Sequence, residues 1–522
     1  MSDIKGAKSL DALNGLTSAS IAIFDANLIF VQVLLSLFIA FFTWCIFKIG
    51  LVFRYLSSFC AYLFIGFKTV FGELKNKYVL ILLLIPLLSS IYFGFTMPVS
   101  YDEALTYVEF THNPIIYCIS SYPLPNNHIF HSILTHISTS IPFFDLLFKL
   151  RIPSIVVSFL TWIIAFSFVK RFYSQKIAFF VIAISSMLFM SVYYSYMSRG
   201  YALVTLFFII SLYAAFNIIK FGSRNRDWAI FSISSVLGFY AIPSFLYPFL
   251  TLNLFIFIYN YKNIKQQFMF NLLIALFTLL LYSPIILHQG FEALTSPAKD
   301  RLWVLSYMPI FFKDTFSEIF GMPLLITFII IFVALFFAFR EREKMTLLLW
   351  LVFGLSPVIL LIGHSVIPFP RTFVYYGFFI IFLIGISFSK YIEKISVKLL
   401  VGGLFIIQSI LCLNFGLNIN GYETFNICYK DMTDKVMDIE KENRGYVLSG
   451  LYLDTHKFEM ISRGYNPDVV KYDRLFISFD DIKQVNVDTI SSEYNYIIID
   501  KDKDVTVYKK PSYSNEYLNL YK

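Results

Sequence analysis

The segment YVLILLLIPLLSSIYFGFTMPVSYDEA occupies residues 78–104. Its first twenty residues, 78–97, contain no charged side chain, and about 20 apolar residues are what an α-helix needs to cross a bilayer. An adjacent pair of acids, Asp102 and Glu103, follows directly. The segment therefore predicts a membrane-spanning helix that leads into a polar loop at one face of the bilayer.

The whole chain shares this apolar character. Of its 522 residues, 58% are hydrophobic and 15% are charged, and the mean hydropathy is +0.69. Soluble domains contain about 45–50% apolar and about 25% charged residues. A chain this apolar has too little polar surface to cover itself in water, so part of it must lie in lipid. The composition excludes a soluble enzyme, a disordered scaffold and a nucleic-acid binder.

Ten further segments have a length and apolarity close to those of 78–97. They are 152–169, 177–197, 200–219, 228–243, 245–261, 268–287, 322–339, 345–363, 372–389 and 398–417. At the N-terminus, 28–47 is uncharged, whereas Arg54 and Lys68 interrupt 51–72. We favour an interfacial helix for 51–72, with 28–47 spanning, over a hairpin of two spans. The total is eleven to thirteen transmembrane helices.

Charge predicts the orientation of these spans. Residues 1–417 hold 28 Lys and Arg against 16 Asp and Glu, whereas 418–522 hold 14 against 18. Short basic connections are retained in the cytoplasm, so the large connections and the tail are expected outside. The cytoplasmic connections are 170–176, 220–226, 262–265, 340–344 and 390–398, and the outer ones are 98–151, 288–321 and 364–371.

We therefore expect an all-α polytopic membrane protein with a small C-terminal extracytoplasmic α/β domain. Residues 1–77 form an N-terminal extension, 78–417 the transmembrane domain, and 418–522 the outer domain. Short β-rich runs at 446–453, 494–500 and 505–509 predict the strands of that last domain. The five cysteines show no metal-binding spacing.

Ionisable and polar groups gather in the predicted first outer loop. Asp102 and Glu103 could be a solvated loop start, and Asp102 could cap a helix beginning at Glu103. Further along lie Asn126, Asn127, His128 and His131. The two histidines are three residues apart and share a helical face, so they could bind a metal, but no third ligand lies at a fixed spacing. Asn126 could simply cap that helix.

Arginines occur at the outer ends of later spans. Arg199 lies in the motif Ser198-Arg199-Gly200-Tyr201, Arg371 follows a proline-rich turn, and Arg301 lies in loop 288–321. Each could extend toward lipid headgroups. However, outer arginines run against the positive-inside trend, and the guanidinium is suited to bidentate phosphate binding. Arginines that hold a phosphate, beside a carboxylate that takes a proton from a hydroxyl, suit group transfer from an anionic lipid.

The ordered combination of these motifs resembles a known family. Tyr-Asp-Glu-Ala-x-Thr-Tyr at 101–107, Pro-x-Pro-Asn-Asn-His-x-x-His-Ser at 123–132 and Ser-Arg-Gly-Tyr at 198–201 are similar to GT-C superfamily membrane glycosyltransferases. Within that superfamily the resemblance is to bacterial enzymes related to protein O-mannosyltransferases and lipid A aminoarabinose transferases. It covers about 78–417, and the extension 1–77 departs from it.

The resemblance implies an enzyme of the bacterial cytoplasmic (inner) membrane that moves a sugar from a polyprenyl-phosphate donor to a hydroxyl acceptor outside. Asp102 matches the loop-one acid, the general base, and Glu103 its supporting neighbour. The donor phosphate would be held by Arg199, Tyr201 and Arg371, with Arg301 a weaker candidate. Substrate would be bound by Asn126, Asn127, His128 and His131. No cofactor is expected, and the single loop-one acid favours a metal-free reaction.

Two alternatives share the many spans and the outer arginines. A polyprenyl-linked glycan polymerase or ligase would use the same donor class with another acceptor, and composition does not separate it from the first. A flippase or carrier for a lipid-linked glycan would need polar groups along a path through the bilayer. The middles of these spans are nearly devoid of such groups.

Overall fold

The computed structural model describes residues 10–123, 126–294, 301–423, 426–427, 430, 447–449, 453–464, 474–478, 496–501 and 504–509. The N-terminal elements are α2 (Leu10–Phe47), α3 (Ile49–Gly72), η1 (Glu73–Lys75) and α4 (Lys77–Thr96). The first loop contains α5 (Tyr101–Thr106), η2 (Tyr107–Thr111), α6 (Ile115–Ser120) and α7 (Ile129–Ser138).

A helical bundle follows the first loop. Its first half comprises α8 (Leu146–Phe172), α9 (Gln175–Ser185), α10 (Phe189–Tyr196), α11 (Tyr201–Phe221), α12 (Asn225–Ala241), η3 (Pro243–Phe245), α13 (Leu246–Asn260), η4 (Tyr261–Asn263) and α14 (Ile264–Gln289). Its second half comprises η5 (Phe291–Leu294), α15 (Arg301–Phe320), α16 (Leu324–Glu341), α17 (Lys344–His364), η6 (Pro370–Phe373), α18 (Tyr375–Ser387), α19 (Ser389–Ile392) and α20 (Val397–Tyr422).

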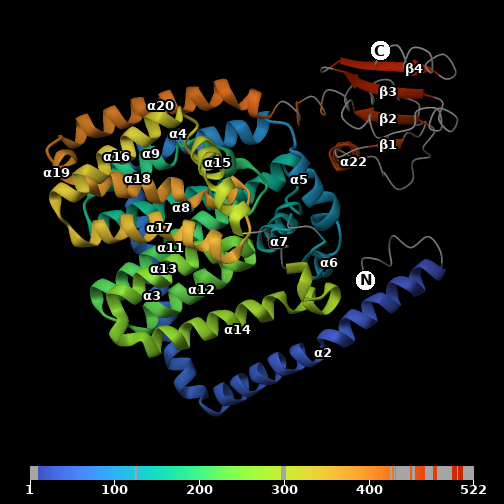
Figure 1. The fold of residues 1–522 in the computed structure, drawn as a ribbon, viewed down its shortest axis with the longest axis horizontal. Helices are drawn as coiled ribbons and strands as arrows, with labels where there is room; N and C mark the ends of the chain where they lie inside the picture. The colour runs from blue at the N-terminus through green and yellow to red at the C-terminus, as the bar shows by residue number, and fades with distance from the viewer. Residues whose placement is uncertain are drawn as a thin grey trace.

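The long helices of the bundle lie side by side, horizontal in Figure 1. The most buried are α8, α9, α11 and α18, whose side chains form one large apolar core. Helices on the outside, such as α16, expose isoleucine and phenylalanine side chains instead. A water-soluble protein would bury these side chains, so their exposure is typical of a surface that faces lipid.

Fewer helices are long and apolar enough to cross a membrane than the sequence predicted. Among the described residues there are eight, or nine if the bent pair α9 and α10 is one span. The predicted span 372–389 is longer than the helix found there, since α18 has 13 residues, and α12 has 17 residues and is not among the candidate spans. The predicted spans 245–261 and 268–287 fall in one helical stretch, Pro243–Gln289. The helical bundle is still that of a multi-pass membrane protein.

One end of the bundle, which we call the α19 end, carries the basic connections. Ion pairs join these connections to one another and to η1: Lys170–Glu73, Lys176–Glu393 and Lys390–Glu341. The opposite end, the α5 end, carries the first loop and the strands (Figure 1).

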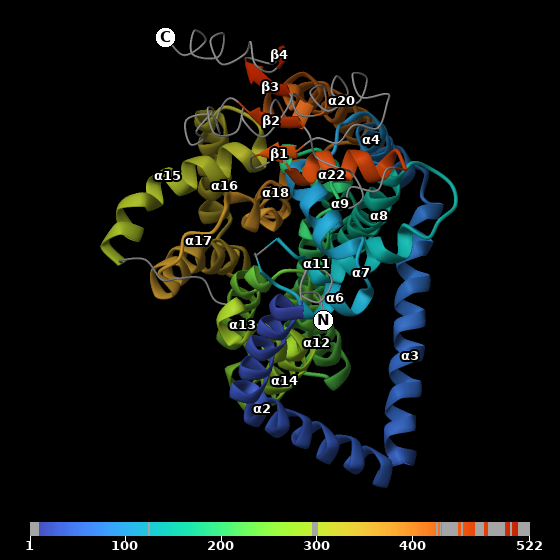
Figure 2. The same cartoon turned by 90° about the vertical axis from the view of Figure 1, so that its right-hand side faces the viewer.

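The two N-terminal helices lie differently against the bundle. α2 runs from the α5 end to the α19 end and packs on α14, where the rings of Phe38 and Phe277 are 5.2 Å apart. α3 runs across the direction of the bundle helices and stands upright in Figure 2. Its Tyr62 hydroxyl donates a hydrogen bond to Asp227 at 3.1 Å, and Arg226 lies 4.5 Å from the Tyr62 ring. α3 therefore lies along the α19 end.

The described part of the tail comprises β1 (Val447–Ser449), α22 (Leu453–Ser462), β2 (Arg474–Ser478), β3 (Tyr496–Lys501) and β4 (Asp504–Lys509). The strands form one sheet in the order β1-β2-β3-β4, in which only the β3–β4 pair is antiparallel. α22 packs on the first loop, where Phe458 is buried with Val99, Ala104, Tyr107 and Leu150. The tail thus lies at the α5 end (Figure 1).

Candidate active site

Asp102 lies in the first turn of α5, just beyond the end of α4. The helix begins at Tyr101 and is capped by Ser100, whose hydroxyl accepts from the Glu103 N–H at 3.2 Å. The Glu103 carboxylate in turn accepts from the Ser100 N–H at 3.0 Å, which completes a capping box. The interpretation of Asp102 as the cap was therefore wrong. Because Ser100 caps the helix, the Asp102 side chain is left for another role.

Glu103 is buried in a network of hydrogen bonds. Its side chain and that of Arg151 have no exposed surface, and Arg151 donates to both carboxylate oxygens, at 3.0 and 2.7 Å. The remaining guanidinium N–H groups donate to the carbonyls of Gly94, Met97 and Pro98 at the end of α4. A buried ion pair in which each charge is also hydrogen-bonded holds its surroundings in one geometry. This places Glu103 in a structural position inside the loop.

Two arginines from distant parts of the chain approach Asp102. Its Oδ2 lies 3.5 Å from Arg371 Nη2 and 3.8 Å from Arg199 Nη2. The side chains of Asp102 and Arg371 are 28% and 30% exposed, whereas that of Arg199 is 2% exposed. The acid and the two arginines predicted from separate motifs therefore form one cluster, with Arg199 at its floor.

Neighbouring backbone and side-chain oxygens hold Arg199 in place. Its Nη1 donates to Thr106 Oγ1 at 2.8 Å, to the Asn126 carbonyl at 3.1 Å and to the Asp102 carbonyl at 3.2 Å. Its Nε has no hydrogen-bond partner among the described residues. The guanidinium is therefore held mainly through Nη1, while Nη2 lies near the Asp102 carboxylate.

The side-chain amides of the two asparagines form hydrogen bonds within the protein. Asn126 Nδ2 donates to Thr106 Oγ1 at 3.2 Å and to the Asp102 carbonyl at 3.3 Å. Asn127 Nδ2 donates to the Cys118 and Ser121 carbonyls at 2.8 Å, and its Oδ1 accepts from Ser132. Asn126 does not cap α7, because His128 is the residue before the helix. Both amides therefore stabilise the loop around Asp102.

The two histidines are buried and their rings contact different elements. His128 Nδ1 accepts a hydrogen bond from the Gly200 N–H at 2.7 Å, and His131 Nε2 lies 3.0 Å from Ser154 Oγ. Burial, with the charge of Arg199, holds the pKa of His128 well below its usual value and lowers that of His131 to about 3. Both rings are therefore neutral at pH 7. No group of three His, Cys, Asp or Glu side chains suited to a metal occurs in the described parts of the chain.

Tyr201 lies between the histidine and Arg371. Its ring meets His128 edge-to-face at 5.0 Å and lies 4.4 Å from the ring of Tyr194. The guanidinium of Arg371 also lies 4.4 Å from the Phe369 ring. The side chain of Arg301, at the start of α15, is outside those that the structure describes.

Two residues that the sequence analysis did not select belong to this region. Arg151 was overlooked, although it lies in the predicted outer loop 98–151, so the argument from the positive-inside trend that selected Arg199 applies to it as well. Glu318, on α15, is partly buried. Burial raises its pKa to about 7, and Asp314 adds to the shift while Arg371 opposes it.

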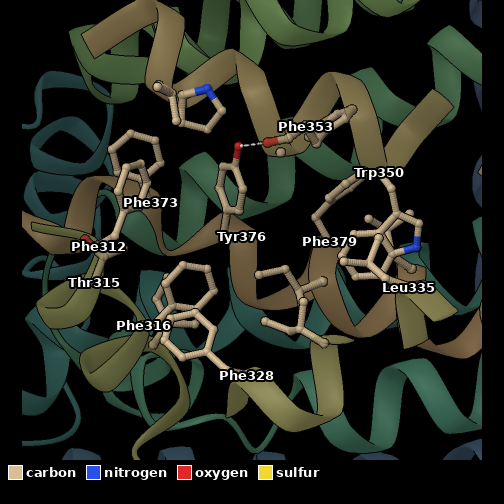
Figure 3. Close-up of a pocket in the computed structure, with 17 residues that line it drawn as sticks. Phe312, Thr315, Phe316, Phe328, Leu335, Trp350, Phe353, Phe373, Tyr376 and Phe379 are labelled. Carbon is tan, nitrogen blue, oxygen red and sulfur yellow. Dashed lines mark hydrogen bonds between the residues drawn. The ribbon is translucent and has the colours of Figure 1, made fainter. Parts of the chain in front are cut away.

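An apolar cavity of about 380 Å³ lies among α15, α16, α17 and α18 (Figure 3). Phenylalanines line much of it, including Phe312, Phe316, Phe328 and Phe373, and the Tyr376 hydroxyl donates to the Phe353 carbonyl at 2.5 Å. Phe373 lies two residues after Arg371 in the same short helix, η6. The cavity therefore begins close to the charged cluster.

Comparisons with known proteins agree with this architecture. No protein-family model and no curated protein matches the chain. Solved structures that match it include ArnT from Cupriavidus metallidurans in the apo state, with a TM-score of 0.54, and the same protein bound to undecaprenyl phosphate, with 0.56. Each is 11% identical and is matched over 85% of this chain and 94% of its own.

The chain therefore has an ArnT-like fold, which agrees with the GT-C fold that the sequence motifs indicated. At 11% identity the similarity concerns the fold, so the chemistry of this chain has to be argued from its own residues.

Proposed function

We propose that this protein is an integral-membrane glycosyltransferase that moves a sugar from a polyprenyl-phosphate donor to a hydroxyl acceptor. The observation that carries the proposal is the cluster of Asp102, Arg199 and Arg371 at the end of an ArnT-like bundle. It combines a partly exposed carboxylate with two cations suited to phosphate. The similar ArnT structure that binds undecaprenyl phosphate supports this donor class.

Asp102 acts as the general base in this proposal. Its carboxylate takes the proton of the acceptor hydroxyl while the oxygen attacks the anomeric carbon, and the lipid phosphate leaves with the electrons of the broken bond. Arg199 and Arg371 stabilise the charge on the departing phosphate. Glu103, paired with Arg151, positions the loop and does not react. The chain's own groups suffice for this reaction, so we propose that it needs no resident metal.

The cavity next to Arg371 accommodates the first isoprene units of the donor. Its walls are almost entirely apolar, and apolar contact is what an isoprenoid chain can offer. Because Phe373 lines the cavity and follows Arg371 in η6, a lipid held there presents its phosphate to the arginine. The sugar, its pentose or hexose class and the acceptor are left open by these contacts.

We place the protein in the bacterial cytoplasmic membrane with the α5 end outside. The basic connections at the α19 end support this orientation through the positive-inside trend. We propose that α3, which crosses that end, lies in the inner interface as an amphipathic helix. We also propose that residues 418–522 form an extracytoplasmic α/β domain beside the active site.

The test replaces the carboxylate of Asp102 with an amide of the same shape. In cells lacking the protein, lipid-linked sugars and envelope glycans are compared after complementation with the wild type, with Asp102→Asn or with Asp145→Asn. General-base catalysis contributes about 10²–10⁴-fold, so Asp102→Asn should lose transfer at equal expression. Asp145→Asn is the matched control from the same loop, because Asp145 caps α8 and asparagine caps equally well. Normal transfer by Asp102→Asn would refute the assigned role.

A further inference from the structure

The ring of His128 is held by one short hydrogen bond. Its Nδ1 lies 2.7 Å from the backbone nitrogen of Gly200, which can only donate. The contact is tight, because a Cβ added at Gly200 would lie 3.0 Å from the His128 side chain. Nδ1 is therefore an acceptor and carries no proton.

This contact assigns the tautomer of the ring. A neutral imidazole has one protonated nitrogen, and since Nδ1 accepts, the proton is on Nε2. Burial and the neighbouring Arg199 keep the pKa of His128 well below its usual value, which agrees with a neutral ring. His128 thus presents an Nε2–H donor.

A second N–H donor lies beside the His128 Nε2–H group. Arg199 Nη2 lies 3.4 Å from His128 Nε2, and a guanidinium has no acceptor. The two groups therefore do not bond to each other. Arg199 Nη1 is already occupied by three oxygens, and Arg199 Nε, buried like the rest of the side chain, has no partner among the described residues. A single oxygen that accepts from both the Arg199 Nη2–H and the His128 Nε2–H would satisfy two N–H groups at once.

We propose that His128 Nε2–H and Arg199 Nη2–H donate to the same oxygen of the lipid-linked phosphate. This inference rests on the proposed function and adds to it a neutral donor at the buried floor of the site. His128 is then a binding residue for the donor phosphate, rather than a metal ligand or an acceptor-binding group. Because phosphate oxygens only accept, the pair of donors also favours a phosphate over an uncharged lipid alcohol.

Two substitutions separate the roles of the two ring nitrogens. Asparagine places an atom near the position of Nδ1 and can accept from Gly200, but it has no group at Nε2. Glutamine reaches the position of Nε2 with an N–H and gives up the acceptor near Gly200. His128→Asn thus keeps the contact within the protein, whereas His128→Gln keeps the donor for the phosphate.

The experiment measures binding of undecaprenyl phosphate and of undecaprenol to the purified full chain in detergent, together with the unfolding midpoint of each variant. A hydrogen bond to a charged group contributes about 1.5–3 kcal/mol, roughly a 10- to 100-fold change in affinity. His128→Asn should therefore lose about 10- to 100-fold in preference for the phosphate over the alcohol. His128→Gln should keep most of that preference, with a lower unfolding midpoint because Gly200 loses its acceptor.

The outcomes distinguish this inference from the proposed function. If the wild type prefers the phosphate and His128→Asn keeps that preference, or His128→Gln loses it as fully as His128→Asn, then the inference is overturned and the donor class stands. If the wild type itself shows no preference for the phosphate, then the proposed donor is wrong and the inference falls with it.

Discussion

Arg151 of α8 pairs with Glu103 of α5 over two hydrogen bonds of 2.7 and 3.0 Å, with both side chains fully buried. Glu103 Oε1 also accepts from the Ser198 N–H at 2.6 Å. One carboxylate thus connects the loop that carries Asp102 with the turn that carries Arg199. The two halves of the proposed site depend on this pair for their relative position.

Breaking the pair from one side should be severely destabilising. Arg151→Met leaves the Glu103 charge buried without a partner, which typically costs about 3–5 kcal/mol in the free energy of unfolding. The measurement is denaturant unfolding of the purified protein in detergent. The double variant Glu103→Gln with Arg151→Met is the control, because it removes both charges and should recover part of the loss. An Arg151→Met protein as stable as the wild type would contradict this account.

Arg371→Ala should weaken binding of the donor phosphate. The Arg371 side chain is 30% exposed beside Asp102, and its buried Nε has no hydrogen-bond partner among the described residues. Loss of a charged hydrogen bond predicts an affinity for undecaprenyl phosphate that is lower by roughly 10- to 100-fold. Arg340→Ala, at the exposed C-terminal turn of α16, is the control and should bind normally. Equal affinities for the two variants would remove Arg371 from the phosphate site.

Gly321→Ala should destabilise the protein through a steric clash. Gly321 has a φ of +60°, and a Cβ there would lie 2.5 Å from the Cβ of Phe189 on α10. Gly222 also has a positive φ, +85°, but nothing lies within 4 Å of an added Cβ. Gly222→Ala therefore measures backbone strain alone. Overpacking costs about 1–3 kcal/mol, so Gly321→Ala should unfold at lower denaturant than Gly222→Ala. Equal losses of stability in the two variants would mean that Phe189 on α10 moves to make room for the added methyl group.

The pH dependence of stability should change in Glu318→Gln. Burial raises the pKa of Glu318 to about 7, above its value of 4.5 in the unfolded chain. The folded state therefore binds the proton more tightly, and this stabilisation is lost as the pH rises from about 4.5 through 7. Glutamine cannot ionise, so the variant should gain in unfolding midpoint relative to the wild type between pH 5 and pH 8. A constant difference across that range would show that Glu318 ionises normally.

Much of the fold follows from the apolar pattern, because spanning helices are read from length and charge alone. Segments 78–97, 200–219 and 398–417 correspond closely to α4, α11 and α20. Segment 177–197 was predicted as one span, yet α9 and α10 meet there at 72°. Ser185 and Ser186 lie at the break, and serine pairs are a known site of helix kinks.

The site was only partly predictable, for a different reason. Asp102, Arg199 and Arg371 were recognised because charge beside a membrane is costly and therefore informative. The contacts among them depend on tertiary packing that no sequence spacing encodes. Asn126 and Asn127 illustrate the limit: substrate binding by these residues stays a prediction, and the structure shows their amide nitrogens donating to Thr106, Cys118 and Ser121. A single sequence does not distinguish an amide that supports a loop from one that binds a ligand.

The hydrogen bonds of Glu103 have a mechanical consequence. Because they connect α5 with the turn before Arg199, Asp102 and Arg199 are held in a fixed position relative to each other. Arg371 belongs to a different part of the bundle, since η6 lies between α17 and α18 in the chain and packs against α15. None of the described hydrogen-bond partners of the Glu103 side chain lies in η6, so Arg371 and the adjoining wall of the apolar cavity are positioned independently of that network.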